Sequence, residues 1–107
     1  MIDGHGGTLC PFTMTEWIPR LVMARLHYLT REKRLNKNTA ALALQGAFIE
    51  ADARFLDKIT LMKEQGSHDP LIIDGAAASG ACCLTAIIGP DFCTIASVGD
   101  CRALLIT

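Results

Sequence analysis

The sequence has no excess of either charge and no long apolar run. Ten Lys and Arg residues balance eleven Asp and Glu residues in 107, which gives a net charge of −1. A nucleic-acid-binding domain needs a basic face to neutralise phosphates, so the charge balance argues against that class. The longest mildly apolar stretch, residues 75–89, is shorter than the roughly 20 apolar residues that span a bilayer. The first seven residues lack the basic and apolar regions of a signal peptide. We therefore expect one domain with no membrane anchor, located in the cytoplasm or the nucleus.

Signatures of disulfide frameworks and zinc sites are missing as well. The sequence contains five cysteines: Cys10, Cys82, Cys83, Cys93 and Cys101. The number is odd and no pair has C-x-x-C spacing, so neither a disulfide framework nor a zinc knuckle is indicated. We interpret these cysteines as reduced, mostly buried small apolar residues of a cytosolic protein. His27 and His68 have no partner at metal-ligand spacing, and we expect both on the surface.

Helical periodicity is present in two segments. The first helix is expected over residues 15–35, beginning between Thr13 and Pro19. Thr13 and Glu16 have capping-box spacing, and a proline is tolerated only near a helix start. The second helix is expected over residues 38–65, where apolar residues recur every three or four positions. Capping by Asn36 or Asn38 and a stop near Gly66 define its ends: these residue types favour helix starts and left-handed helix ends respectively.

The last part of the chain, residues 80–107, has the character of strands. Three short apolar runs, residues 81–88, 92–98 and 101–106, are separated by turn sequences, which predicts an antiparallel three-stranded meander after two antiparallel helices. The fold class is therefore α+β. The first and last runs are apolar on both alternating faces, and such strands require cover on both sides. Because two helices cover only one face, we expect a piece of a larger sandwich, or a sheet that binds a partner or a second copy.

The glycine-rich start of the chain, Asp3-Gly4-His5-Gly6-Gly7, combines a carboxylate with an imidazole two residues later. Met1 and Ile2 have the character of a short strand that delivers Asp3 into this loop. Glycine-rich turns of this composition also arise for conformational reasons alone. The residue types nevertheless fit a hard-metal site with a nearby proton donor, because Mg²⁺ and Mn²⁺ prefer oxygen ligands.

Four segments are similar to motifs of a known family. Ile2–Gly7 is similar to a D-G-H-G-G loop, and Ala47–Phe55, with Asp52, to an A-F-x-x-x-D-x-x-F stretch. Ser79–Cys82 is similar to an S-G-[ST]-T strand, and Ser97–Ala103 to an N-[VC]-G-D-S-R-A hairpin. On these residues, which extend over nearly the whole chain, the sequence resembles the metal-dependent protein phosphatases, the PPM or type 2C serine/threonine phosphatases.

This resemblance implies a fold and a reaction. The fold is a four-layer α-β-β-α sandwich, of which residues 1–107 form the N-terminal portion of the catalytic domain, truncated at both ends, with residues 1–7 as the metal loop. By resemblance, Asp3 bridges two Mg²⁺ or Mn²⁺ ions, the Gly4 carbonyl helps to hold one, and Asp100 reaches a third metal position. A metal-activated water then attacks the phosphorus of a phosphoserine or phosphothreonine in a phosphoprotein, and His5 protonates the departing oxygen. For Asp100, a plain role as a hairpin-turn residue is an equal alternative.

The sequence also departs from the family pattern. An N-terminal strand with an acidic metal ligand and an Arg, and later D-G-x-W/F-D and D-N segments, have no counterpart in these 107 residues. One bridging carboxylate does not hold two divalent cations, so we expect the isolated chain to have little or no phosphatase activity. Cys101 stands where Ser is usual, and Ala81 and Cys82 replace a hydroxyl pair.

Two other functions compete with the phosphatase interpretation. A non-catalytic phosphatase-like module that binds a partner is favoured by the missing ligands and opposed by the presence of Asp3, Gly4 and His5. An esterase with an oxyanion loop at His5-Gly6-Gly7 is a minor alternative, opposed by the lack of a G-x-S-x-G elbow and of a His after Ser79 to complete a triad.

Overall fold

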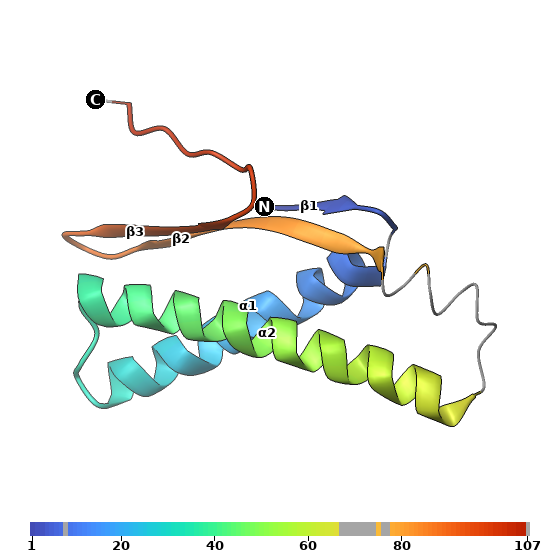
Figure 1. The fold of residues 1–107 in the computed structure, drawn as a ribbon. Coiled ribbons are helices and arrows are strands. Elements are labelled where there is room, and N and C mark those ends of the chain that lie inside the picture. Colours follow the sequence, from blue (N-terminus) through green and yellow to red (C-terminus); the bar gives the residue numbers. More distant parts are fainter. Residues whose placement is uncertain (8, 67–74, 76–77, 107) are drawn as a thin grey trace.

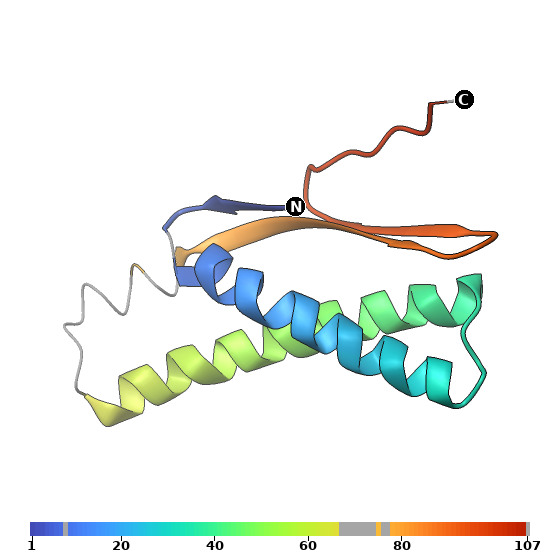
Figure 2. The same ribbon diagram turned by 180° about the vertical axis from the view of Figure 1, so that it is seen from behind.

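The protein forms a layer of two helices beneath a three-stranded sheet. The computed structural model describes residues 1–7, 9–66, 75 and 78–106. Along the chain the elements are β1 (Ile2–His5), α1 (Leu9–Arg31), α2 (Lys37–Gln65), β2 (Gly80–Ile88) and β3 (Cys93–Val98). Both helices lie on the same face of the sheet, and the chain after β3 leaves the opposite face (Figures 1 and 2). The arrangement confirms the α+β class with two helices and an antiparallel three-stranded sheet.

Helix α1 begins earlier than the capping pattern predicts. It starts at Leu9, where the backbone N–H of Cys10 donates a buried hydrogen bond of 3.1 Å to the Ser79 hydroxyl. Such a bond satisfies one of the free N–H groups of a helix N-terminus. Pro19 consequently lies inside the helix rather than at its start. The capping-box spacing was misleading because the Thr13 side chain is buried against the core. The helix ends at Arg31, before residue 35.

Helix α2 agrees with the sequence pattern. The Asn36 side chain accepts hydrogen bonds from the backbone N–H groups of Asn38 and Thr39, and the Thr39 hydroxyl accepts one from the backbone N–H of Asn36, which forms a capping box. At the other end Gly66 adopts the left-handed conformation (φ 60°) that terminates helices. Its buried stripe consists of Ala40, Ala43, Leu44, Ala47, Ala51, Phe55 and Ile59. This stripe forms the core together with α1 and Cys83.

The sheet has the strand order β1-β2-β3, with both pairs antiparallel. Its third strand is therefore β1, whereas the run at residues 101–106 was predicted to be a strand and forms none in the structure. Gly99, with φ 95°, turns the chain away from the sheet after β3. Leu104, Leu105 and Ile106 are exposed. An apolar run is compatible with a strand, but pairing also requires a backbone path along a neighbouring strand.

Only one face of the sheet is covered by the described residues. Ile2, Cys83 and Ala96 pack toward the helices. On the opposite, outer face Ile88 is 82% exposed and Ile95 is 49% exposed. The Cα positions extend only 15 Å along the thinnest axis, as expected for two layers. In the described part of the chain, neither helix is long and apolar enough to span a membrane.

Candidate functional site

Strand β1 positions Asp3 and His5 at one end of the sheet. The antiparallel register pairs Asp3 with Cys82 and His5 with Gly80. Side chains alternate between the two faces of a strand, so Asp3 and His5 belong to the outer face while Ile2 and Gly4 belong to the face that the helices cover. Ile2 packs on the core, which agrees with this assignment. Asp3 and His5 thus lie in a strand, and only Gly6 and Gly7 form the turn that was predicted as a loop over residues 1–7.

At Gly4, strand β1 packs closely against the first turn of α1. A Cβ atom at Gly4 would lie 2.4 Å from Cγ of Pro11, a distance that real Cβ atoms do not tolerate. Packing against α1 therefore explains the glycine at this position without any metal. The proposed use of its carbonyl as a ligand is an additional role that this contact does not test.

Asp100 lies on the same side of the sheet as Asp3. Asp3, Cys82 and Gly99 lie side by side across the sheet. Cys82 pairs with Asp3 on one side, and on the other a Cβ at Gly99 would lie 2.4 Å from the Cys82 Sγ. Asp100 is the residue that follows Gly99 in the chain. Burial raises the pKa of the Cys101 thiol, and the charges of Cys82, Asp100 and Asp3 raise it further. Both carboxylates therefore act on the same thiol.

The donor set fits part of a hard-cation site. Asp3 and Asp100 are exposed, and within the described part of the chain the Asp3 carboxylate makes no hydrogen bond or ion pair. Carboxylate oxygens of this kind are ligands that Mg²⁺ and Mn²⁺ accept. Across the described residues, however, no three His, Cys, Asp or Glu side chains converge on a point that would hold a metal ion. Two carboxylates are present, and a complete dinuclear site needs more.

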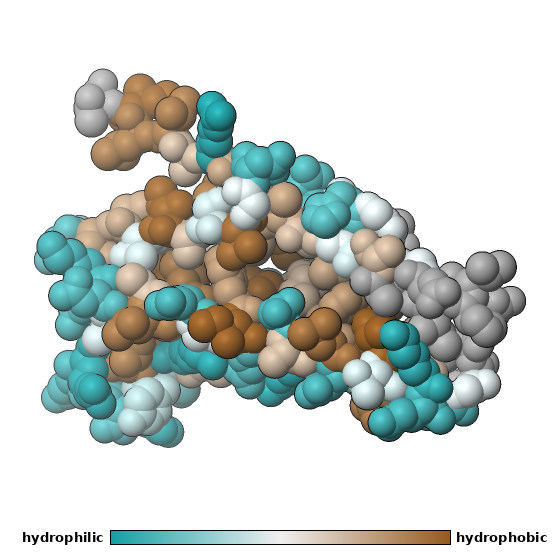
Figure 3. Space-filling model, viewed as in Figure 1, coloured by the Kyte–Doolittle hydropathy of each residue, from teal (hydrophilic) through white to brown (hydrophobic). Residues whose placement is uncertain are grey.

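The His5 side chain lies against Gly80 of the neighbouring strand β2, at the edge of a cavity lined by residues of the sheet and of both helices. A Cβ at Gly80 would lie 2.3 Å from Cε1 of His5, so the imidazole occupies the space that the missing side chain leaves. The cavity has a volume of about 300 Å³. Its lining includes His5, Asp52, Phe55 and Ser79, and a hollow between the sheet and α2 is visible in Figure 3.

Asp52 is a residue that sequence reasoning did not assign to the site. The motif around Phe48 and Phe55 contained it, but its role was not inferred. In the structure it lines the same cavity as His5. Burial raises the pKa of the Cys10 thiol and the nearby Asp52 carboxylate raises it further, which places this negative charge close to the first turn of α1.

In a comparison with known proteins, three similar proteins are all plant protein phosphatases 2C. The chain resembles a part of plant protein phosphatases 2C. It is 30% identical over 105 residues to "Probable protein phosphatase 2C 22" of Arabidopsis thaliana, covering 98% of this chain and 22% of that protein. It is 34% identical over 103 residues to "Probable protein phosphatase 2C 68" and 29% identical over 103 residues to "Probable protein phosphatase 2C 14" of the same plant, with 96% of this chain covered in each case.

The chain spans about a fifth of the length of these relatives, namely 18–23%. The similarity to this phosphatase-2C segment extends over nearly all of the chain, so it does not depend on a single motif. No protein-family model matches the chain, and no solved structure matches it significantly.

Of the two histidines expected on the surface, His27 is exposed in α1, and His68 lies outside the described residues.

Proposed function

We propose that the chain is a segment of a metal-dependent serine/threonine protein phosphatase that acts on phosphoproteins. Asp3, Gly4 and Asp100 contribute to its binding of Mg²⁺ or Mn²⁺, and His5 is the general acid. The observation that carries the proposal is the placement of Asp3 and Asp100 on one side of the sheet, with His5 two residues from Asp3 on the same strand. The similarity to plant phosphatases 2C over nearly the whole chain supports it.

Each residue has a distinct task in this proposal. The bound ions supply a water acidified enough to attack phosphorus near neutral pH. Asp3 and Asp100 would hold the cations through their carboxylate oxygens, and both residues are exposed. His5 donates a proton to the departing seryl or threonyl oxygen, since an imidazole exchanges protons near neutral pH. The described residues bring only two carboxylates together, which is too few to hold two metal ions. We therefore expect the isolated chain to hydrolyse phosphopeptides very slowly.

Paramagnetic broadening by Mn²⁺ tests the metal site directly. Titrating the isotope-labelled chain with Mn²⁺ is expected to broaden the amide resonances of Asp3, Gly4 and Asp100 first. The Asp3→Asn variant is expected to lose this selective broadening. Asp91→Asn is the matched control, because Asp91 is an exposed aspartate in the turn between β2 and β3, at the far end of the sheet. Broadening centred on Asp91, or unchanged in Asp3→Asn, would contradict the proposal.

A phosphothreonine-peptide assay with Mn²⁺ tests the expected low activity. The isolated chain is expected to show a rate close to that of the Asp3→Asn variant, because the described residues bring no complete ligand set together. Turnover comparable with that of a full-length phosphatase 2C would show that the site is complete without further residues.

A second candidate function is a phosphatase-like module that binds through the outer face of the sheet. Exposed Ile88 and Ile95 on that face favour it. The absence, within the described residues, of a three-ligand metal group also favours it. In this case the occupant is a partner or a second copy of the chain, and selective Mn²⁺ broadening near Asp3 is not expected.

A further inference from the structure

Two cysteines, Cys82 and Cys101, lie beside the carboxylates of the candidate site. The Sγ of Cys82 lies against the backbone of Gly99, where a Cβ would come within 2.4 Å of it. The chain then folds back, because the Ser97 hydroxyl donates a 3.3 Å hydrogen bond to the carbonyl of Cys101. Consecutive Cα atoms are about 3.8 Å apart, so the Cα of Cys101 lies within roughly 7.6 Å of the Gly99 Cα. Cys82 thus lies against Gly99, two residues before Cys101, and its charge acts on the Cys101 thiol, so the two cysteines are close; both side chains are half-buried.

The other cysteines are in unsuitable positions. Cys83 is the sequence neighbour of Cys82, but it belongs to the opposite face of β2 and is buried in the core against the helices. Cys10 is buried in the first turn of α1. Cys93 is exposed and pairs with Ile88 at the far end of the sheet. Of the five cysteines, Cys82 and Cys101 are therefore the two that are placed to form a disulfide with each other.

We propose that hydrogen peroxide joins Cys82 and Cys101 in a disulfide that fixes the turn after β3 against β2. Two S–H bonds and the O–O bond of peroxide break, the S–S bond forms, and the peroxide is reduced to two molecules of water. A dithiol reductant such as thioredoxin reverses the reaction by thiol–disulfide exchange. Transient disulfides of this kind occur in reducing compartments as redox-sensitive devices. The modification does not depend on the proposed phosphatase function.

The test uses the whole reduced chain, treated with hydrogen peroxide. Cleavage before aspartates separates the cysteines of this region into three fragments: residues 74–90, 91–99 and 100–107. Mass spectrometry without reduction is expected to show fragments 74–90 and 100–107 linked, with a loss of two hydrogens. The link is expected to vanish in Cys82→Ser and in Cys101→Ser, and to persist in Cys83→Ala and in the control Cys93→Ser.

The oxidised chain provides a second readout. A disulfide that closes a loop restricts the unfolded chain, so the urea midpoint of the oxidised protein is expected to rise above that of the reduced protein. Cys101→Ser is expected to show no such change on peroxide treatment. Separate oxidation of Cys82 and Cys101 to sulfinic acids, a link that persists in Cys82→Ser, or dimers through Cys93 alone would each overturn the proposal.

Discussion

At the scale of single residues, the turn after β1 requires glycine at position 6 for two reasons, its backbone conformation and a close backbone contact. Gly6 has a φ of 68°, and a Cβ there would lie 2.6 Å from the carbonyl oxygen of Ala78. Gly66 has a similar φ of 60°, but a Cβ there meets nothing within 4 Å. The two positions therefore share the left-handed backbone and differ in the backbone contact. That difference makes them a matched pair.

The Gly6→Ala variant is expected to lose more free energy of unfolding than Gly66→Ala. The left-handed conformation costs a non-glycine residue about 1–2 kcal/mol, and this part is common to both variants. Gly6→Ala has the additional cost of displacing the Ala78 carbonyl, so the turn that follows Asp3 and His5 moves. Urea denaturation of both variants measures the difference. Equal losses would show that the Ala78 contact relaxes without cost.

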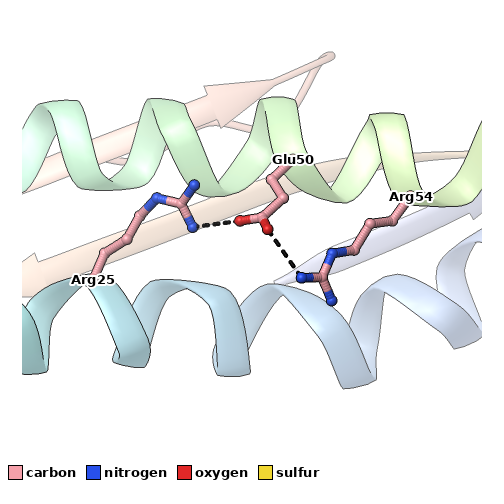
Figure 4. A network of polar contacts seen from close by, with 3 residues as sticks. All are labelled: Arg25, Glu50 and Arg54. Atoms are coloured by element: carbon pink, nitrogen blue, oxygen red, sulfur yellow. Dashed lines mark hydrogen bonds and ion pairs between the residues drawn. The ribbon is translucent and has the colours of Figure 1, made fainter.

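At the scale of elements, a polar network joins the two helices. The Glu50 carboxylate of α2 accepts a hydrogen bond of 2.7 Å from Nη1 of Arg25 in α1 and one of 3.0 Å from Nη2 of Arg54 in its own helix (Figure 4). Arg25 and Glu50 are about one-third exposed, at 33% and 34%. The hydrogen bond from Arg25 is the main cause that lowers the pKa of Glu50 below its ordinary value. The ionised form is therefore the one that stabilises the helix pair.

The Glu50→Gln variant is expected to unfold at a lower urea concentration than the wild type at neutral pH. Because the folded-state pKa is lowered, the stabilisation is fully present above the ordinary carboxyl pKa of 4.5 and is lost as the pH falls through the folded-state value. The gap between wild type and variant is expected to narrow in that acidic range. Glu16→Gln is the control, since Glu16 and Arg20 are 52% and 75% exposed and such pairs contribute little. A gap that does not depend on pH would contradict this account.

The elements also show which parts of the fold the sequence can predict. Helix α2 was predictable almost to the residue, because its apolar period, its Asn36 cap and its Gly66 end are local signals. The start of α1 was not, because it depends on Ser79, which is distant in the sequence. Residues 101–106 were predicted as the third strand of the sheet, and at β1 only a short strand at Met1 and Ile2 was expected, since local apolarity does not specify a pairing partner. Asp3 and Asp100 were named from motifs, whereas their common placement required the register of β1 and β2.

At the scale of the whole molecule, apolar side chains remain exposed on two surfaces. On the outer face of the sheet these are Ile88 and Ile95. On the side of α2 that faces away from the core they are Leu42, Ile49 and Leu56. Figure 3 shows apolar patches along α2 and on the segment after β3, between polar areas. Exposed apolar side chains that gather into a patch mark an interaction surface.

The two surfaces are distinguishable by experiment, and we expect the sheet to be the one that associates. On the outer face of the sheet Ile88 and Ile95 are diagonal neighbours on adjacent strands, at the end away from Asp3 and His5, whereas the exposed apolar residues of α2 alternate with Asp52 and Asp57 along the helix. Sedimentation velocity of the isolated chain is expected to show association that increases with concentration. Ile95→Thr, which retains a strand-forming residue, is expected to shift the chain toward monomer. Ile49→Gln, which retains a helix-forming residue on α2, is expected to leave association unchanged. The reverse pattern would assign the interaction to α2, and a monomer at all concentrations would show that the bare sheet face is tolerated in water.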